Sequence, residues 1–158
     1  MEYQVKKSLS GRWLSRSTRM LPVVAMAVLI AGCGTMGMGM GMGPAGKVSL
    51  SGANEVPAIA TTATGSGVIK VAADHTVSGS ISTSGIDGKA AHIHMAPKGS
   101  NGPVIVPLTK VADGSWTVPE GAKLTDAQYA GYVAGDLYVN VHSAANPAGE
   151  IRGQLSSN

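Results

Sequence analysis

The sequence predicts an all-β, antiparallel domain with one short helix. Apolar and polar residues alternate along several short runs, which is the pattern of strands that are buried on one face only. Clusters of Gly, Pro, Asn and Asp separate these runs, at a spacing typical of a β-sandwich or β-barrel. The domain is expected over residues 47–158, which is enough chain for one hydrophobic core.

Residues 1–33 are predicted to be an export signal and not part of the fold. A basic leader precedes an apolar run over residues 21–31, which is too short to span a membrane. The run ends in IAGC (30–33), which resembles a bacterial lipobox and implies that Cys33 is lipidated as the mature N-terminus. The alternative is an ordinary signal peptide with a chance cysteine. Because Gly34 follows the cysteine, we expect a cell-envelope lipoprotein, anchored in the outer membrane and facing the periplasm or the cell surface.

Removing the leader changes the charge of the chain. The whole sequence carries 12 Lys and Arg residues against 9 Asp and Glu residues, a net charge of +3. The leader holds five of the basic residues and one of the acidic residues, so the remainder carries seven against eight, or −1. Nucleic-acid binding therefore has no electrostatic support. Cys33 is the only cysteine, so an exported domain must be stable without a disulfide.

Residues 34–46, GTMGMGMGMGPAG, are predicted to be a flexible tether between the lipid and the domain. Glycine at nearly every second position cannot pack a core. The tether also carries four methionines, Met36, Met38, Met40 and Met42. Thioethers are soft ligands that suit Cu(I), so the alternatives are a plain linker and a linker that also captures Cu(I).

The predicted strands alternate inward and outward side chains. In DLYVNVHS (136–143), the outward positions are Tyr138, Asn140 and His142. The inward positions of this run, of KVSLSG (47–52) and of TVSGSIST (76–83) are mostly apolar: Val48, Leu50, Val77, Gly79, Ile81, Thr83, Leu137, Val139 and Val141. Turns are expected at residues 73–75, 86–88, 101–103, 113–115 and 146–149. Because the sequence has no phenylalanine, we expect a core of Val, Ile, Leu and Ala, with Trp116 as its large member.

One short helix is predicted near residues 125–133. Its N-cap is expected to be Thr125, and Gln128 at the third helical position completes a capping box. Leu124 and Tyr129 are spaced to form a hydrophobic staple across this terminus, and a glycine follows as a stop signal.

Three of the four histidines are predicted to lie on the outer face of the sheet. In AAHIHMA (90–96), His92 and His94 are two apart on a strand, so both side chains point the same way. His142 joins them only if its strand is a neighbour, and ring nitrogens roughly 3–4 Å apart would then suit a metal ion. Imidazole suits Zn, Cu, Fe and Ni, and three imidazoles leave one coordination position open. The alternative is a set of solvated histidines, because His-x-His alone is a weak motif.

The surroundings of these histidines give further expectations. The second ring nitrogen of each ligand needs an acceptor, which is expected to be Asn140, Glu150 or a backbone carbonyl. The fourth histidine, His75, is expected at a solvated hairpin tip. The charged residues Glu55, Glu150 and Arg152 are expected to form a structural ion-pair cluster that joins the first strand to the last.

No catalytic residue is predicted from sequence motifs. Cys33 is assigned to the lipid, and neither a nucleophile elbow nor a pair of carboxylates for acid–base catalysis is visible.

Three motifs make the chain resemble a chordin-type (CHRD) domain across residues 47–155. They are LSGANEVP (50–57), AAHIHMAPKGSNGPVI (90–105) and AGDLYVNVHSAANPAGEIRGQL (134–155), in that order. The resemblance implies a β-sandwich of immunoglobulin-like, Greek-key build. It also implies occurrence in extracellular multidomain proteins, with a poorly defined biochemical activity.

The histidine motifs have a second, fainter resemblance, to copper–zinc superoxide dismutases. In that family the histidines that match His92, His94 and His142 are copper ligands. The resemblance therefore implies a superoxide-dismutase-like sandwich that holds copper, with zinc as the alternative. A further bridging histidine, the zinc-ligand cluster and the disulfide of the dismutases are missing here. A complete copper–zinc site is thereby excluded, and a mononuclear copper site is left.

Three functions stay open from the sequence. The first is a lipid-anchored module that binds copper through the three histidines. The second is a redox enzyme of superoxide-dismutase type, with Lys98 or Arg152 as a cation near the metal. The third is a metal-free interaction or structural domain outside the cytoplasm, whose protein partner the sequence does not identify.

Overall fold

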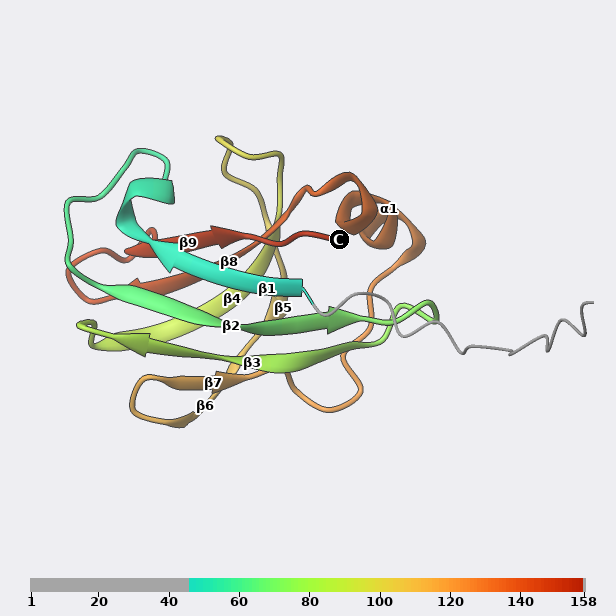
Figure 1. The fold of residues 1–158 in the computed structure, drawn as a ribbon, viewed down its shortest axis with the longest axis horizontal. Coiled ribbons are helices and arrows are strands. Elements are labelled where there is room, and N and C mark those ends of the chain that lie inside the picture. Colours follow the sequence, from blue (N-terminus) through green and yellow to red (C-terminus); the bar gives the residue numbers. More distant parts are fainter. Residues whose placement is uncertain (1–45, 158) are drawn as a thin grey trace, which may run out of the picture. The chain divides into compact units, whose positions relative to one another are not determined.

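The computed structural model describes residues 46–157, which form an all-β fold with one short helix (Figure 1). The strands are β1 (Gly46–Ser51), β2 (Thr64–Val71), β3 (Val77–Ser84), β4 (Gly88–Met95), β5 (Val104–Pro107), β6 (Thr109–Ala112), β7 (Ser115–Thr117), β8 (Leu137–Ser143) and β9 (Ile151–Gln154). A 3-10 helix, η1 (Gly52–Asn54), follows β1, and an α-helix, α1 (Asp126–Ala134), precedes β8. The predicted export signal, its Cys33 and the methionines of the tether lie outside the described residues.

The described strands form one antiparallel sheet in the order β5-β4-β8-β9-β1-β2-β3-β7-β6. The two ends of this order, β5 and β6, are consecutive in the chain and are separated by Leu108 alone. The backbone N–H of Leu108 donates to the carbonyl of Ala91 in β4 over 2.8 Å. The sheet therefore curls until it is nearly closed, and its two halves face each other across the core.

One hydrophobic core fills the space between the two halves. The predicted inward positions Val48, Leu50, Val77, Ile81, Leu137, Val139 and Val141 are all buried in it. Trp116 is 2 % exposed and is the large member of this core, as predicted. A Cβ on Gly88 would meet the Trp116 ring at 2.9 Å and the Val141 side chain at 3.2 Å, so β4, β7 and β8 pack closely here.

The outer face of β8 differs from the prediction. Tyr138 is 1 % exposed and Asn140 is 2 % exposed, although the alternation assigned both to an outward face. The segment that contains η1 and the loop between β4 and β5 cover this face, since Asn140 contacts Glu55 and Tyr138 contacts Gly102. Alternation predicted the direction of these side chains correctly, but not that other segments bury them.

The helix α1 has the predicted capping box. The hydroxyl of Thr125 accepts from the Gln128 backbone N–H over 3.2 Å, and the Gln128 side chain accepts from the Thr125 N–H over 2.9 Å. Gly135 ends the helix in the left-handed conformation, with φ of 81°. Figure 1 shows α1 beside the end of the chain after β9, and the Tyr132 hydroxyl donates to the carbonyl of Ser156 there. In the described part of the chain, no helix is long and apolar enough to cross a membrane.

Candidate metal centre

The candidate centre is built by the direct pairing of β4 with β8. In their antiparallel register, His94 lies opposite Tyr138 and His92 lies opposite Asn140. His142 lies opposite Ala90, one diagonal step from His92 on the same face. From the sequence, His142 is expected to join His92 and His94 only if their strands are neighbours. The strands β4 and β8 are neighbours, so the three imidazoles can converge.

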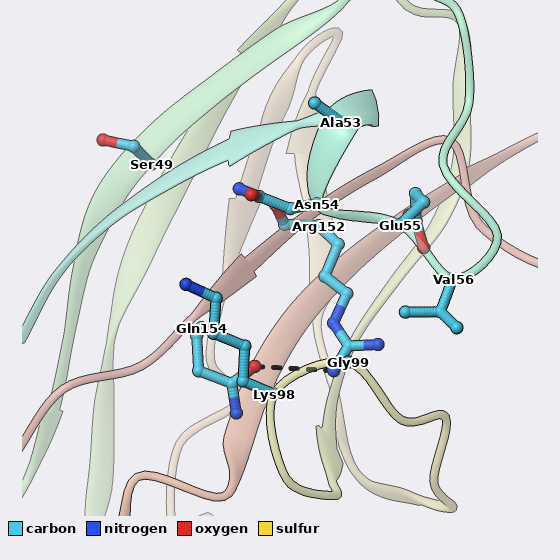
Figure 2. Close-up of a pocket in the computed structure, with 9 residues that line it drawn as sticks. All are labelled: Ser49, Ala53, Asn54, Glu55, Val56, Lys98, Gly99, Arg152 and Gln154. Atoms are coloured by element: carbon cyan, nitrogen blue, oxygen red, sulfur yellow. Dashed lines mark hydrogen bonds between the residues drawn. The ribbon is translucent and has the colours of Figure 1, made fainter.

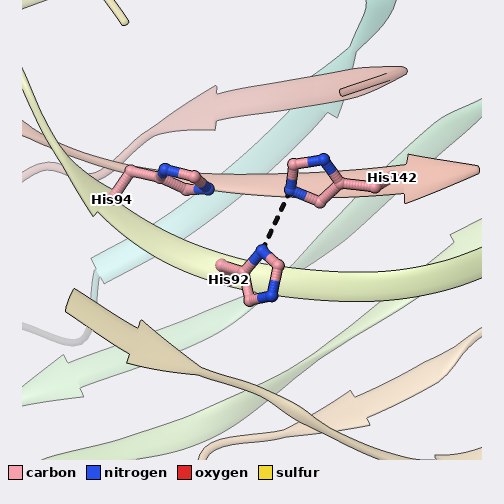
Figure 3. Close-up of side chains that lie close together, drawn as sticks. All are labelled: His92, His94 and His142. Carbon is pink, nitrogen blue, oxygen red and sulfur yellow. Dashed lines mark hydrogen bonds between the residues drawn. The ribbon is translucent and has the colours of Figure 1, made fainter. Parts of the chain in front are cut away.

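The three rings point toward one another (Figure 3). One nitrogen from each of His92, His94 and His142 lies within 4.8 Å of the other two. The Nδ1 atom of His92 is 3.0 Å from Nε2 of His142, within the expected spacing. Two nitrogens that each bind one ion at about 2.0–2.1 Å are at most about 4 Å apart. A small rotation of one ring would bring all three nitrogens within this distance of one another.

Backbone carbonyls fix the tautomers of two rings. Nδ1 of His94 is 3.0 Å from the carbonyl oxygen of Gly102, and Nδ1 of His142 is 3.1 Å from that of Pro147. A carbonyl can only accept, so both Nδ1 atoms carry hydrogen and both Nε2 atoms present a lone pair. The acceptors are thus carbonyls, the third of the predicted possibilities, while Asn140 and Glu150 contact other groups.

The Nε2 atom of His94 is the most informative atom of the cluster. It is buried and has no hydrogen-bond partner among the described residues. Nδ1 of the same ring is occupied by Gly102, so Nε2 is left as a lone pair that faces the other two imidazoles. Because Nε2 of His142 presents a lone pair, Nδ1 of His92 carries the hydrogen of their 3.0 Å contact. Once His92 adopts its other tautomer, His92 Nδ1, His94 Nε2 and His142 Nε2 would present three lone pairs, which suits a metal ion that prefers imidazole.

Burial keeps the three imidazoles neutral. It lowers the pKa of His92, and the charges of His142 and His94 lower it further. It also lowers the pKa of His94, against the raising effect of the bond to the Gly102 carbonyl and with a further lowering effect from the charge of His142. Burial also lowers the pKa of His142, against the raising effect of its bond to Pro147. Neutral imidazole is the form that binds metals, so the cluster is ready to bind at neutral pH.

Tyr138 supports the cluster and was not identified from the sequence. Its ring stacks on that of His94, with centroids 4.9 Å apart and planes at 8°. Its hydroxyl accepts from the Gly102 N–H over 3.1 Å, and Gly102 in turn holds His94. The sequence signal that points to this loop is the Asn-Gly-Pro turn at residues 101–103, which follows the His-x-His strand after five intervening residues.

The fourth histidine does not belong to the cluster. His75 lies in the turn between β2 and β3 with φ of 71°, and its ring stacks on Tyr129 of α1 with centroids 4.2 Å apart. Its Nδ1 is 3.5 Å from a carboxylate oxygen of Asp126. The predicted hairpin turn is thus confirmed, but the ring of His75 is only partly exposed, because α1 packs against this turn.

The charged residues of the last strand have other partners than predicted. Glu150 accepts from the hydroxyls of Thr61 and Ser143. Arg152 lies over the ring of Tyr138, with its guanidinium carbon 3.4 Å from the centroid. Among the described residues no ion pair joins Arg152 to Glu55 or Glu150. Glu55 is nonetheless near enough for the charge of Arg152 to lower its pKa, although burial has the larger, opposite effect.

Comparisons with known proteins give one match. The family model described as the CHRD domain matches residues 47–155, which is nearly all of the described part of the chain. No curated protein and no solved structure matches the chain.

Proposed function

The chain belongs to the CHRD domain family, and on that premise we propose that its three-histidine cluster binds one metal ion, copper in preference to zinc. The observation that carries the proposal is the buried, unpartnered Nε2 of His94. An unsatisfied buried acceptor costs about 1–3 kcal/mol, and a metal ion bound to this lone pair would remove that cost. Copper is preferred because divalent copper binds nitrogen ligands more tightly than zinc does.

Each residue has a defined part in this proposal. His92, His94 and His142 would hold the ion, while the carbonyls of Gly102 and Pro147 keep two of the rings in the metal-binding tautomer. Bound copper would supply one-electron chemistry. Rapid dismutation of superoxide by the copper-loaded chain would make it a redox enzyme, and its absence would leave a binding module.

Metal-dependent stability tests the cluster. The chain is stripped of metal, and its melting temperature is measured with and without added Cu(II) or Zn(II). A metal that binds only the native state adds about 2.7 kcal/mol of stability at one hundred times its Kd. Replacing His94 or His142 by alanine should abolish this rise.

The matched control is His75→Ala, which removes an imidazole outside the cluster and should leave the metal response intact. Equal metal responses from the wild type and the His94→Ala/His142→Ala double variant would refute the site. The three histidines would then be ordinary residues of the outer sheet face.

We also propose that the domain is held at the cell envelope by lipid on Cys33. The proposal rests on the residues before this cysteine and on the glycine after it. The Cys33→Ser variant should remain uncleaved at its full length or become soluble. A variant that is processed and still resists alkaline washing of the membrane would count against the anchor.

A further inference from the structure

A second site lies on the far side of Tyr138 from the histidines. A cavity of about 390 Å³ opens between η1, the loop after β4 and strand β9 (Figure 2). Strand β8 runs between β4 and β9, so His94 and Arg152 reach the Tyr138 ring from opposite sides. The cavity, which we call the Arg152 cavity, is thus separate from the metal centre. Its volume falls in the range of small-molecule sites.

Arg152 is a buried cation without a counterion. It is 1 % exposed, and among the described residues no carboxylate oxygen lies within 4.0 Å of its nitrogens. Its partners are the neutral amide oxygens of Asn101 at 3.2 Å and Gln154 at 3.4 Å, and the face of Tyr138. A buried charge that lacks an opposite charge is costly, so this wall of the cavity favours an anion.

Glu55 lines the same cavity but cannot fully neutralise Arg152. Burial raises the pKa of Glu55 to about 7, although the charge of Arg152 opposes the rise. The carboxyl group is therefore more readily protonated near neutral pH than an ordinary glutamate is, which limits the negative charge that it offers Arg152. One of its oxygens, Oε1, is buried and has no hydrogen-bond partner in the described part of the chain. Lys98, which is exposed, adds a second positive charge to the lining, so the cavity is positive overall.

We propose that the Arg152 cavity binds a small organic monocarboxylate. Its carboxylate group takes a charge-assisted hydrogen bond from Lys98 and supplies the negative charge that Arg152 lacks. The ligand is a monoanion because Glu55, in the same lining, would repel a second negative charge.

Propionate is the probe, and its neutral analogue propionamide is the matched ligand control. The full-length chain, labelled with nitrogen-15 and stripped of metal, is titrated with each compound and followed by NMR. Because no metal is present, the result does not depend on the histidine cluster. Propionate should give saturable shifts at the amides of Gly99, Asn101 and Gln154, and propionamide should give none.

Three variants complete the test. Lys98→Ala should weaken propionate binding about tenfold, the effect of losing one charge-assisted hydrogen bond. Lys98 is exposed, so the fold should survive, and Lys70→Ala on β2 is the matched control that should bind like the wild type. Glu55→Gln should bind propionate at least as tightly as the wild type, because it removes the repelling charge.

The proposal is overturned if propionate causes no saturable shifts, or if propionamide causes the same shifts. Equal affinity in Lys98→Ala and the wild type would also overturn it. Inorganic phosphate that binds where propionate does not would show that the cavity takes a different class of anion.

Discussion

His94 shows how one side chain is oriented from several directions. Its ring face rests on Tyr138, its Nδ1 donates to Gly102, and its Nε2 faces the other two imidazoles. These contacts remove rotational freedom before any ion binds, which lowers the entropic cost of binding. Strand parity predicted that His92 and His94 share a face. It could not predict the carbonyl of Gly102, because tertiary contacts set the path of that loop.

The pKa values of the three histidines predict how metal affinity depends on pH. Burial lowers the pKa of each below its ordinary value of 6.5, so protons compete with the metal only in more acidic solution. The affinity for Zn(II) should therefore begin to fall at a lower pH than it would for histidines of ordinary pKa. It should fall steeply once the pH passes the lowered values, because up to three protons are then taken up.

A competition titration of Zn(II) from pH 5 to pH 8 measures this dependence. A short unfolded peptide that contains His-x-His is the reference, and its affinity should begin to fall at higher pH than that of the folded chain. A zinc affinity of the folded chain that begins to fall at the same pH as that of the peptide, or at a higher pH, would contradict the prediction.

Features of helices and strands that depend only on nearby residues were predicted correctly from the sequence. The capping box of α1 appears as predicted, because its atoms belong to residues three apart in the sequence. The inward faces of β1, β3 and β8 also follow the alternation. The burial of Tyr138 and Asn140 was missed, because the segments that cover them show no periodicity and fold over the sheet only in the tertiary structure.

Loss of the N-cap of helix α1 should destabilise the domain. Thr125→Ala removes the hydroxyl that accepts from the Gln128 N–H, and with it half of the capping box. The free energy of unfolding should fall by about 1 kcal/mol, as is usual for loss of an N-cap. Urea denaturation measures the change.

The control for this variant is Thr62→Ala, an exposed threonine in the segment after η1, which should change stability by less than about 0.5 kcal/mol. If both variants lost the same stability, the capping box would not be the cause. Metal binding should be unaffected in either variant, because α1 contributes no residue to the histidine cluster.

Over the whole domain, the polar side chains gather on one buried layer outside the core. This layer lies between the outer face of β4, β8 and β9 and the segments that cover it. It holds the buried polar residues Glu55, His94, Asn140 and Arg152. The candidate metal centre and the Arg152 cavity both belong to it, on opposite sides of Tyr138. The sequence predicted an ion-pair cluster of Glu55, Glu150 and Arg152, but the partners of these residues depend on the loops and could not be predicted.

Titration of this layer connects the stability of the domain to pH in two opposing ways. The pKa of Glu55 is raised from 4.5 to about 7, so the native state binds more protons than the unfolded chain between these values. The free energy of unfolding therefore falls as the pH rises through this window. The histidines act oppositely. Their lowered pKa values mean that the unfolded chain binds more protons below pH 6.5, so stability rises with pH there.

Glu55→Gln separates the two effects. Without metal, the pH profile of the wild type combines a carboxyl contribution to stability that falls between pH 5 and pH 7 with an imidazole contribution that rises. The glutamine variant keeps only the histidine contribution, so its free energy of unfolding should rise from pH 5 to pH 7. The difference between the two pH profiles should be on the order of 2 kcal/mol, measured by urea denaturation. Glu120→Gln, the same change at an exposed position, should keep the wild-type profile. Parallel profiles for Glu55→Gln and the wild type would show that Glu55 does not hold a proton in the native state at pH 6.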